Sequence, residues 1–186
     1  SEFADRGSML HAGTEMVLVN WPENMKQAQP FINELIGQNF EYTDQDPIDD
    51  ELIATKIGPA LTEWFRIVKE YGFVDWWIES RVSLETVIEG GFGKIDIYAI
   101  DKKKRLHVLD WKFGDGVMVP AKENMSLMFY MIAGLYDPDE EMQKFTEDCA
   151  NECFLHIVQP VVNSSQPIHD VWETTIDHCE DFLDHL

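Results

Sequence analysis

Residues 74–113 contain three strand-like segments in succession, and this pattern constrains the fold more than any other feature of the chain. Apolar residues recur with a period of two over 74–87, 92–100 and 106–113, as in strands with one buried face. The sequence EGG separates the first two segments, and DKKKR separates the last two. Because such short connections join antiparallel neighbours, the sequence predicts an antiparallel three-strand meander.

Helical patterns surround this meander. Apolar residues recur at helical spacing over 49–71, where Pro59 is expected to kink the helix. Further helices are predicted over 121–136, 138–150 and 177–186, and further strands over 153–162 and 171–175. The predicted fold class is therefore α/β, with a mixed central sheet that contains the meander and is flanked by helices.

The length of 186 residues suits one domain with a sizeable core. Residues 1–8, SEFADRGS, read as the remnant of an expression tag, so Met9 is the expected native start and 9–186 the expected single domain. A hydrophobic fraction of 45% and an aromatic fraction of 12% indicate a globular chain rather than a disordered one.

The chain carries a formal charge of −21, which repels nucleic acids and other polyanions unless it is neutralised locally. The same charge favours divalent cations wherever carboxylates gather. The longest apolar run, Leu127–Tyr136, falls short of the roughly 20 residues of a membrane span. Without a visible secretory signal, and with an odd number of cysteines, the chain is predicted to be cytoplasmic, in a bacterial host, and not bound to a membrane.

The segment HVLDWKFGDG, residues 107–116, places two charges in an apolar strand. Alternation puts Asp110 and Lys112 on the same face, where either charge alone is costly to bury. A divalent cation would make the pair tolerable, because an Asp110 oxygen and the backbone carbonyl of Trp111 are suitable ligands for Mg²⁺ or Mn²⁺. Lys112 would then orient a water or stabilise charge on a phosphate. The structural alternative is an ion pair at a sheet edge.

A second carboxylate, Asp96, lies in the preceding predicted strand between Ile95 and Ile97. Counted outward from the connecting turn, Asp96 and Asp110 are at similar distances, so they are expected side by side. Two adjacent carboxylates repel unless a cation lies between them. Glu79, one strand earlier, is a third candidate catalytic and metal-binding acid, with Glu85 and Glu89 as competitors.

The chain resembles the PD-(D/E)xK nuclease superfamily in a series of features: Glu79, then Gly93–Asp96 (GxxD), then Asp110–Lys112 (DxK), then a helix with Tyr130. The segment from Leu106 onward is most similar to RecB-like exonucleases of phages and prophages, and the likeness covers about 49–172. The resemblance implies a restriction-endonuclease-like core and Mg²⁺- or Mn²⁺-dependent hydrolysis of DNA. It also implies that Tyr130 supports the site or contacts nucleic acid; the alternative is a plain core tyrosine.

Two positions depart from the pattern of these relatives. Ser126 stands where the trailing helix usually has glutamine, so that nucleic-acid or supporting contact is altered or lost. AGTEMVLVN resembles an upstream Gly-Thr-x-x-His helix, but Val17 stands in the place of the histidine, which ligates metal in many relatives. Either His11 or Glu15 substitutes, or the site has one ligand fewer.

The sequence thus predicts a metal-dependent deoxyribonuclease, as an exonuclease in phage DNA recombination, replication or degradation. DNA is the expected partner. Because the chain is acidic, DNA binding would require a local basic groove, oligomerisation or a phage recombination partner. A catalytically weakened nuclease fold that binds or regulates is the alternative function, motivated by Val17, Ser126 and the acidity.

Overall fold

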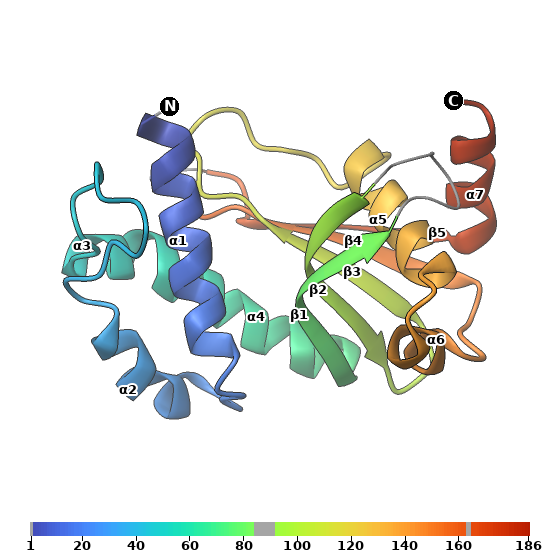
Figure 1. Ribbon diagram of the computed structural model, residues 1–186, viewed down its shortest axis with the longest axis horizontal. Coiled ribbons are helices and arrows are strands. Elements are labelled where there is room, and N and C mark those ends of the chain that lie inside the picture. Colours follow the sequence, from blue (N-terminus) through green and yellow to red (C-terminus); the bar gives the residue numbers. More distant parts are fainter. Residues whose placement is uncertain (1, 84–91, 163–164) are drawn as a thin grey trace. The chain divides into compact units, whose positions relative to one another are not determined.

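The computed structural model describes residues 2–83, 92–162 and 165–186, apart from the side chains of 2–4, 79–83 and 92–93. The chain forms two compact units, and it passes back and forth between them (Figure 1). The first unit contains 1–70, 111–119 and 158–169, and the second contains 71–110, 120–157 and 170–186. That 9–186 is a single domain, preceded by a tag remnant, stays a prediction.

The first unit is mainly helical. Its elements are α1 (Glu2–Leu18), α2 (Met25–Glu34), α3 (Asp50–Leu52), the π-helix η1 (Ile53–Ile57) and α4 (Gly58–Tyr71). Helix α1 packs closely against the side chains of Ile48 and Ile57. A Cβ atom on Gly13 would lie only 3.2 Å from the side chain of Ile48 and 3.3 Å from that of Ile57. Gly13 therefore lets this helix approach the apolar core of the unit.

The predicted kink at Pro59 takes the form of a π-helical turn. Proline has no N–H to continue the α-helical ladder, and the Gly58 N–H bonds to the Ile53 carbonyl five residues back. A side chain at position 58 would collide with this carbonyl, since its Cβ would lie 2.7 Å from the Ile53 oxygen. The Gly-Pro pair therefore fixes the wide turn that separates α3 from α4.

The second unit is built on a five-stranded sheet in the order β1-β2-β3-β4-β5. Its strands are β1 (Phe73–Ser83), β2 (Phe92–Asp101), β3 (Leu106–Trp111), β4 (Glu152–Val158) and β5 (His169–Thr175). Strands β1, β2 and β3 pair in antiparallel fashion, which confirms the predicted meander. The predicted continuation of the first strand to residue 87 and the EGG turn lie outside the described residues.

The remaining pairings make the sheet mixed. The Ala150 N–H bonds to the Lys104 carbonyl at one end of the β3–β4 pair, and the Lys112 N–H bonds to the Val158 carbonyl at the other end. These bonds join start to start and end to end, so β3 and β4 are parallel. Strand β5 returns antiparallel to β4, as the bond from the Gln159 N–H to the Ile168 carbonyl indicates.

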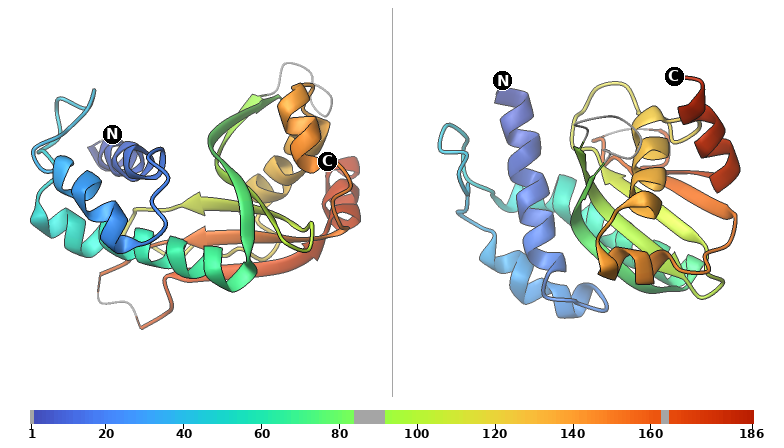
Figure 2. Two further views of the ribbon diagram at one scale, coloured as in Figure 1. Left: turned by 90° about the horizontal axis from the view of Figure 1, so that it is seen from below. Right: turned by 45° about the vertical axis from the view of Figure 1, so that its right-hand side comes forward.

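Three helices flank this sheet: α5 (Met125–Tyr136), α6 (Glu140–Thr146) and α7 (Ile176–Asp184). Helix α5 lies beside α7 and packs on β1 and β2 (Figure 2). A Cβ atom on Gly134 would lie 2.5 Å from the Tyr98 ring, so glycine permits this close contact. The predicted α/β class with a mixed sheet and flanking helices is confirmed.

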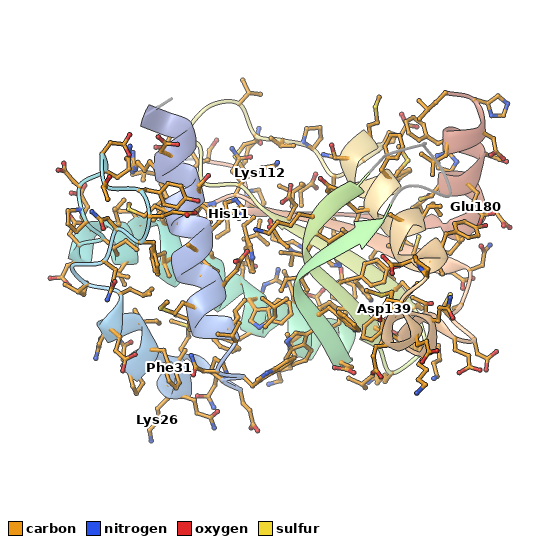
Figure 3. The ribbon with its side chains drawn as sticks, viewed as in Figure 1. His11, Lys26, Phe31, Lys112, Asp139 and Glu180 are labelled. Atoms are coloured by element: carbon orange, nitrogen blue, oxygen red, sulfur yellow. The ribbon has the colours of Figure 1, made fainter. Side chains whose placement is uncertain are left out.

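Helices α5 and α6 begin later than predicted because polar side chains cap them. Asn124 accepts a hydrogen bond from the Leu127 N–H, and Asp139, labelled in Figure 3, accepts from Glu141 and Met142. Each cap satisfies a backbone donor of the first turn and so sets the start of the helix.

Within the described ranges, none of the helices combines the length and the apolar character needed to cross the bilayer.

The sheet face that bears His107 contains a buried polar chain. Asp101 accepts from the backbone of Lys103 and Arg105, from Arg105 Nε at 2.8 Å and from His107 Nε2 at 2.9 Å. The other ring nitrogen of His107 lies 2.8 Å from His156 Nε2. Because a neutral His107 that donates to Asp101 must accept at Nδ1, His156 is the donor in that second bond.

This buried hydrogen-bonded group makes the stability of the protein depend on pH. Burial lowers the pKa of His107 from 6.5, although Asp101 partly opposes the shift. Burial alone would raise the pKa of Asp101, but the hydrogen bonds from His107, Arg105 and Lys103 outweigh it and bring that pKa to about 2. The unfolded chain therefore binds protons first at both groups, so acid weakens folding through each of them.

We expect the stabilisation from His107 to be lost as pH falls below 6.5, and that from Asp101 between 3.8 and about 2. His107→Gln keeps a donor for Asp101 but cannot titrate. The difference in unfolding free energy between wild type and this variant, from urea melts, should shrink between pH 7.5 and 5. His178→Gln, on the exposed face of α7, serves as control. A difference that does not vary with pH would contradict the assignment.

Candidate functional site

Three acidic residues occupy neighbouring positions across β1, β2 and β3. Ile78 pairs with Ile97 and Ser80 with Ile95, so the backbone of Glu79 lies across from Asp96. Ile97 in turn pairs with Leu109, and the next residues outward are Asp96 and Asp110. The predicted adjacency of Asp96 and Asp110 thus follows the register of the backbone. The side chain of Glu79 lies outside the described residues.

Asp96 and Asp110 belong to the sheet face on which α5 packs. Side chains alternate along a strand, so Asp96 shares a face of β2 with Tyr98, whose hydroxyl donates to the Met131 carbonyl of α5 at 2.9 Å. Directly opposed residues of an antiparallel pair share a face, which places Asp110 with Asp96. Asp96 is 9% exposed and Asp110 is half-buried. The two residues therefore face the same side of the sheet, where Asp96 is buried and Asp110 is partly exposed.

Lys112 follows Asp110 by two residues and extends the strand beyond Trp111. Its N–H bonds to the Val158 carbonyl at 2.9 Å, and its side chain, labelled in Figure 3, is half-buried. Trp111 is fully buried, with its ring centroid 6.4 Å from that of Trp64. The indole thus anchors the residue whose backbone carbonyl is the predicted metal ligand.

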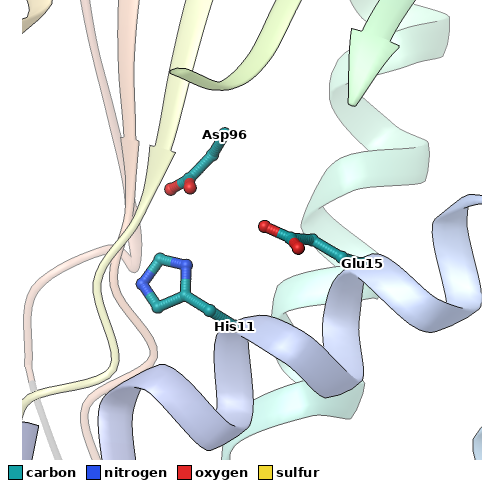
Figure 4. A group of neighbouring side chains, drawn as sticks. All are labelled: His11, Glu15 and Asp96. Atoms are coloured by element: carbon teal, nitrogen blue, oxygen red, sulfur yellow. The ribbon is translucent and has the colours of Figure 1, made fainter. Parts of the chain in front are cut away.

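On α1, His11 and Glu15 project from one side of the helix (Figure 4). A ring nitrogen of His11 and a carboxylate oxygen of Glu15 lie within 4.8 Å of each other, as expected for residues one turn apart. Val17 is fully buried, and helical geometry puts it about 160° around the axis from Glu15. A histidine at position 17 would thus point into the core of this unit. Of the three positions 11, 15 and 17 on α1, only His11 and Glu15 have side-chain atoms that could bind a metal ion.

Ser126 and Tyr130 lie one turn apart on α5, as the sequence predicts. Ser126 is exposed and Tyr130 is half-buried, so Tyr130 is not a fully enclosed core residue. Their predicted roles in supporting the site or contacting nucleic acid stay predictions.

One buried lysine was not identified from the sequence. Lys56 lies on η1, is buried, and lines a cavity of about 620 Å³ in the first unit. Its amine pairs with the Asp115 carboxylate and donates to the Pro160 carbonyl at 2.9 Å. The available signal was a lysine at a position that helical spacing assigns to the apolar face of 49–71.

The three cysteines are free thiols. Cys153 of β4 and Cys179 of α7 are buried and share a hydrogen bond, which together with burial raises the pKa of Cys153. Neither residue is exposed, and the pair packs a helix against the sheet.

Comparison with known families gives one assignment. The model of a family described as a protein of unknown function, DUF2800, matches residues 1–185, so the chain belongs to that family. A comparison with curated proteins finds no match. The family description states no activity, so the chemistry must be argued from the residues themselves.

Proposed function

We propose that this member of the DUF2800 family is a metal-dependent deoxyribonuclease that hydrolyses phosphodiester bonds with Mg²⁺ or Mn²⁺, as an exonuclease of the RecB-like type. The observation that carries the proposal is the row of Glu79, Asp96 and Asp110 across three neighbouring strands. Followed by Lys112, this row reproduces the order of acids and lysine in the PD-(D/E)xK pattern.

The donor set suits a hard divalent cation. Asp96 and Asp110 supply carboxylate oxygens, and the Trp111 carbonyl and Glu79 are further candidate ligands of the same chemical type. Two carboxylates in a poorly solvated region repel each other, and a divalent cation offsets this repulsion. Such an ion, when bound, supplies a water of lowered pKa and neutralises charge on the scissile phosphate.

Lys112 would act beside these acids. Its ammonium can hold the attacking water by a hydrogen bond and stabilise the negative charge that grows on the phosphate oxygens. Trp111, packed in the core, would limit the movement of the intervening backbone and so keep Asp110 and Lys112 at a fixed separation. Orientation of this kind accounts for a large part of catalysis in hydrolytic enzymes.

Either His11 or Glu15 is proposed to supply the ligand that many RecB-like nucleases take from a histidine at the place of Val17; the alternative is a site with one ligand fewer. Both side chains offer ligand atoms on one side of α1, whereas Val17 is buried and has no ligand atom. Single His11→Ala and Glu15→Ala variants test which one contributes to metal affinity.

The charge of −21 opposes DNA binding, so the enzyme is proposed to need a local basic groove, oligomerisation that concentrates such a groove, or a phage recombination partner. A weakened nuclease fold that binds or regulates is the second candidate. Two observations favour this second candidate: Val17 is buried and Ser126 is exposed, and both stand where the RecB-like nucleases that the sequence resembles carry functional side chains.

The deciding experiment is a cleavage assay. Purified protein is incubated with linear and circular DNA, single- and double-stranded, in Mg²⁺, Mn²⁺ or EDTA, beside Lys112→Ala. We expect cleavage of linear DNA with metal, none with EDTA, and loss of rate by about a hundredfold or more in the variant. Intact DNA under every condition, with retained binding of DNA or protein, would instead favour the binding module.

A further inference from the structure

The loop that follows Lys112, residues 113–119, is tied to the segment 158–160 by side chains. Gln159 is 2% exposed, and its amide donates to the Gly114 carbonyl at 3.1 Å and accepts from the Val119 N–H at 2.8 Å. The Lys112 N–H bonds to the neighbouring Val158 carbonyl. These bonds fix the two ends of the loop.

Lys56 ties down the middle of the same loop. Its ammonium bonds to Asp115 and to the Pro160 carbonyl, and therefore joins the loop to the segment that Gln159 also holds. The side chain of Lys56 is 1% exposed, whereas that of Asp115 is 51% exposed. A buried ammonium is costly unless it is paired, so Asp115 is held to the position of the lysine rather than the reverse.

Gly114 and Gly116 on either side of Asp115 make such an anchor necessary. Neither glycine has a φ in the left-handed region, and a Cβ atom at either position would have no atom within 4 Å. The glycines are therefore not required by space or by backbone conformation in this structure. They leave the loop with high conformational entropy, which the bonds from Lys56 and Gln159 must overcome.

We propose that Lys56 is a positioning residue of the proposed nuclease: by holding Asp115, it orders the loop after the DxK segment and so keeps Lys112 in its working orientation. The inference rests on the proposed function, and it adds a residue far from the predicted motif in sequence. Lys56 lies within the π-helix η1, shortly before Gly58-Pro59, at a position that helical spacing assigns to the apolar face.

The test is a double-mutant cycle of Lys56→Met and Lys112→Ala, measured as metal-dependent DNA cleavage. Methionine fills a similar volume, and half-exposed Asp115 remains solvated, so we expect the variant to fold. Lys56→Met should lower kcat about 10- to 100-fold with little change in KM, as a displaced catalytic group does. In the Lys112→Ala background the same change should have almost no effect. Lys69→Met, on the exposed side of α4, is the matched control.

Hydrogen exchange separates the two ways of failing. In Lys56→Met the amides of Lys112 and Val119 should exchange about tenfold faster or more, because the loop opens more often. If the wild type cleaves DNA, either of two results would overturn the positioning role alone. One is an equal effect of Lys56→Met in the wild-type and Lys112→Ala backgrounds, and the other is unchanged hydrogen exchange in Lys56→Met. A wild type without cleavage in any metal would overturn it together with the proposed nuclease.

Discussion

Asp110→Asn is expected to reduce metal-dependent cleavage of DNA by about a thousandfold or more, because it removes a charged ligand that the transition state needs. Asparagine keeps the shape of the side chain, so the strand and its pairing with β2 are expected to persist. The loss should appear in kcat rather than in DNA affinity. The measurement is single-turnover cleavage at saturating protein with Mg²⁺ and with Mn²⁺.

Metal binding offers a readout that does not depend on activity. A cation that binds only the folded protein stabilises it by about 2.7 kcal/mol at a hundred times its dissociation constant. We therefore expect Mn²⁺ to raise the unfolding midpoint of the wild type, and to raise it much less for Asp110→Asn and Asp96→Asn. The same loss in both variants would show that the two acids share one ion.

Asp148→Asn is the matched control for charge. It removes one negative charge from an exposed position, and its backbone φ of 58° suits asparagine at least as well as aspartate. Cleavage and the response to Mn²⁺ should be unchanged. If Asp110→Asn behaved like this control, Asp110 would not be a metal ligand, and the hydrolase proposal would lose its main support.

Much of the second unit could be predicted because local patterns determine it. The period-two segments and the DKKKR turn give the meander, and the equal distances of Asp96 and Asp110 from that turn give their adjacency in the register. The starts of α5 and α6 were predicted too early because apolar spacing does not reveal which polar residue, here Asn124 or Asp139, will cap the first turn.

Contacts between residues far apart in the chain could not be predicted from such patterns. His107 and His156 occupy separate strands, and neither their pairing nor the parallel arrangement of β3 and β4 has a signature in either segment. Lys56 interrupts an apolar helical stripe, which marks it as unusual in the sequence. Its hydrogen-bond partners, the Asp115 carboxylate and the Pro160 carbonyl, become visible only in the folded chain.

The hydrogen-bonded group of Asp101, Arg105, His107 and His156 is expected to contribute strongly to the stability of the sheet. Asp101 has 1% of its surface exposed and accepts four hydrogen bonds, two of them from backbone N–H groups of the turn and one each from Arg105 and His107. The carboxylate therefore adds four hydrogen bonds to the backbone bonds of this turn, in which the Asp101 N–H donates to the Arg105 carbonyl and the Lys104 N–H to the Asp101 carbonyl. Arg105 also lies over the Phe154 ring, which ties the turn to β4.

Asp101→Ala should lower the free energy of unfolding by about 3–5 kcal/mol, because it leaves buried donors without an acceptor. Asp101→Asn retains one acceptor oxygen and should cost less, so it remains measurable if the alanine variant fails to fold. Asp181→Ala, on the exposed side of α7, should stay within about 0.5 kcal/mol of wild type. Urea unfolding followed by circular dichroism gives all three values. A loss of under about 1 kcal/mol for Asp101→Ala would mean that water or neighbouring groups replace the carboxylate, and that the chain from Asp101 to His156 does not hold β2, β3 and β4 together.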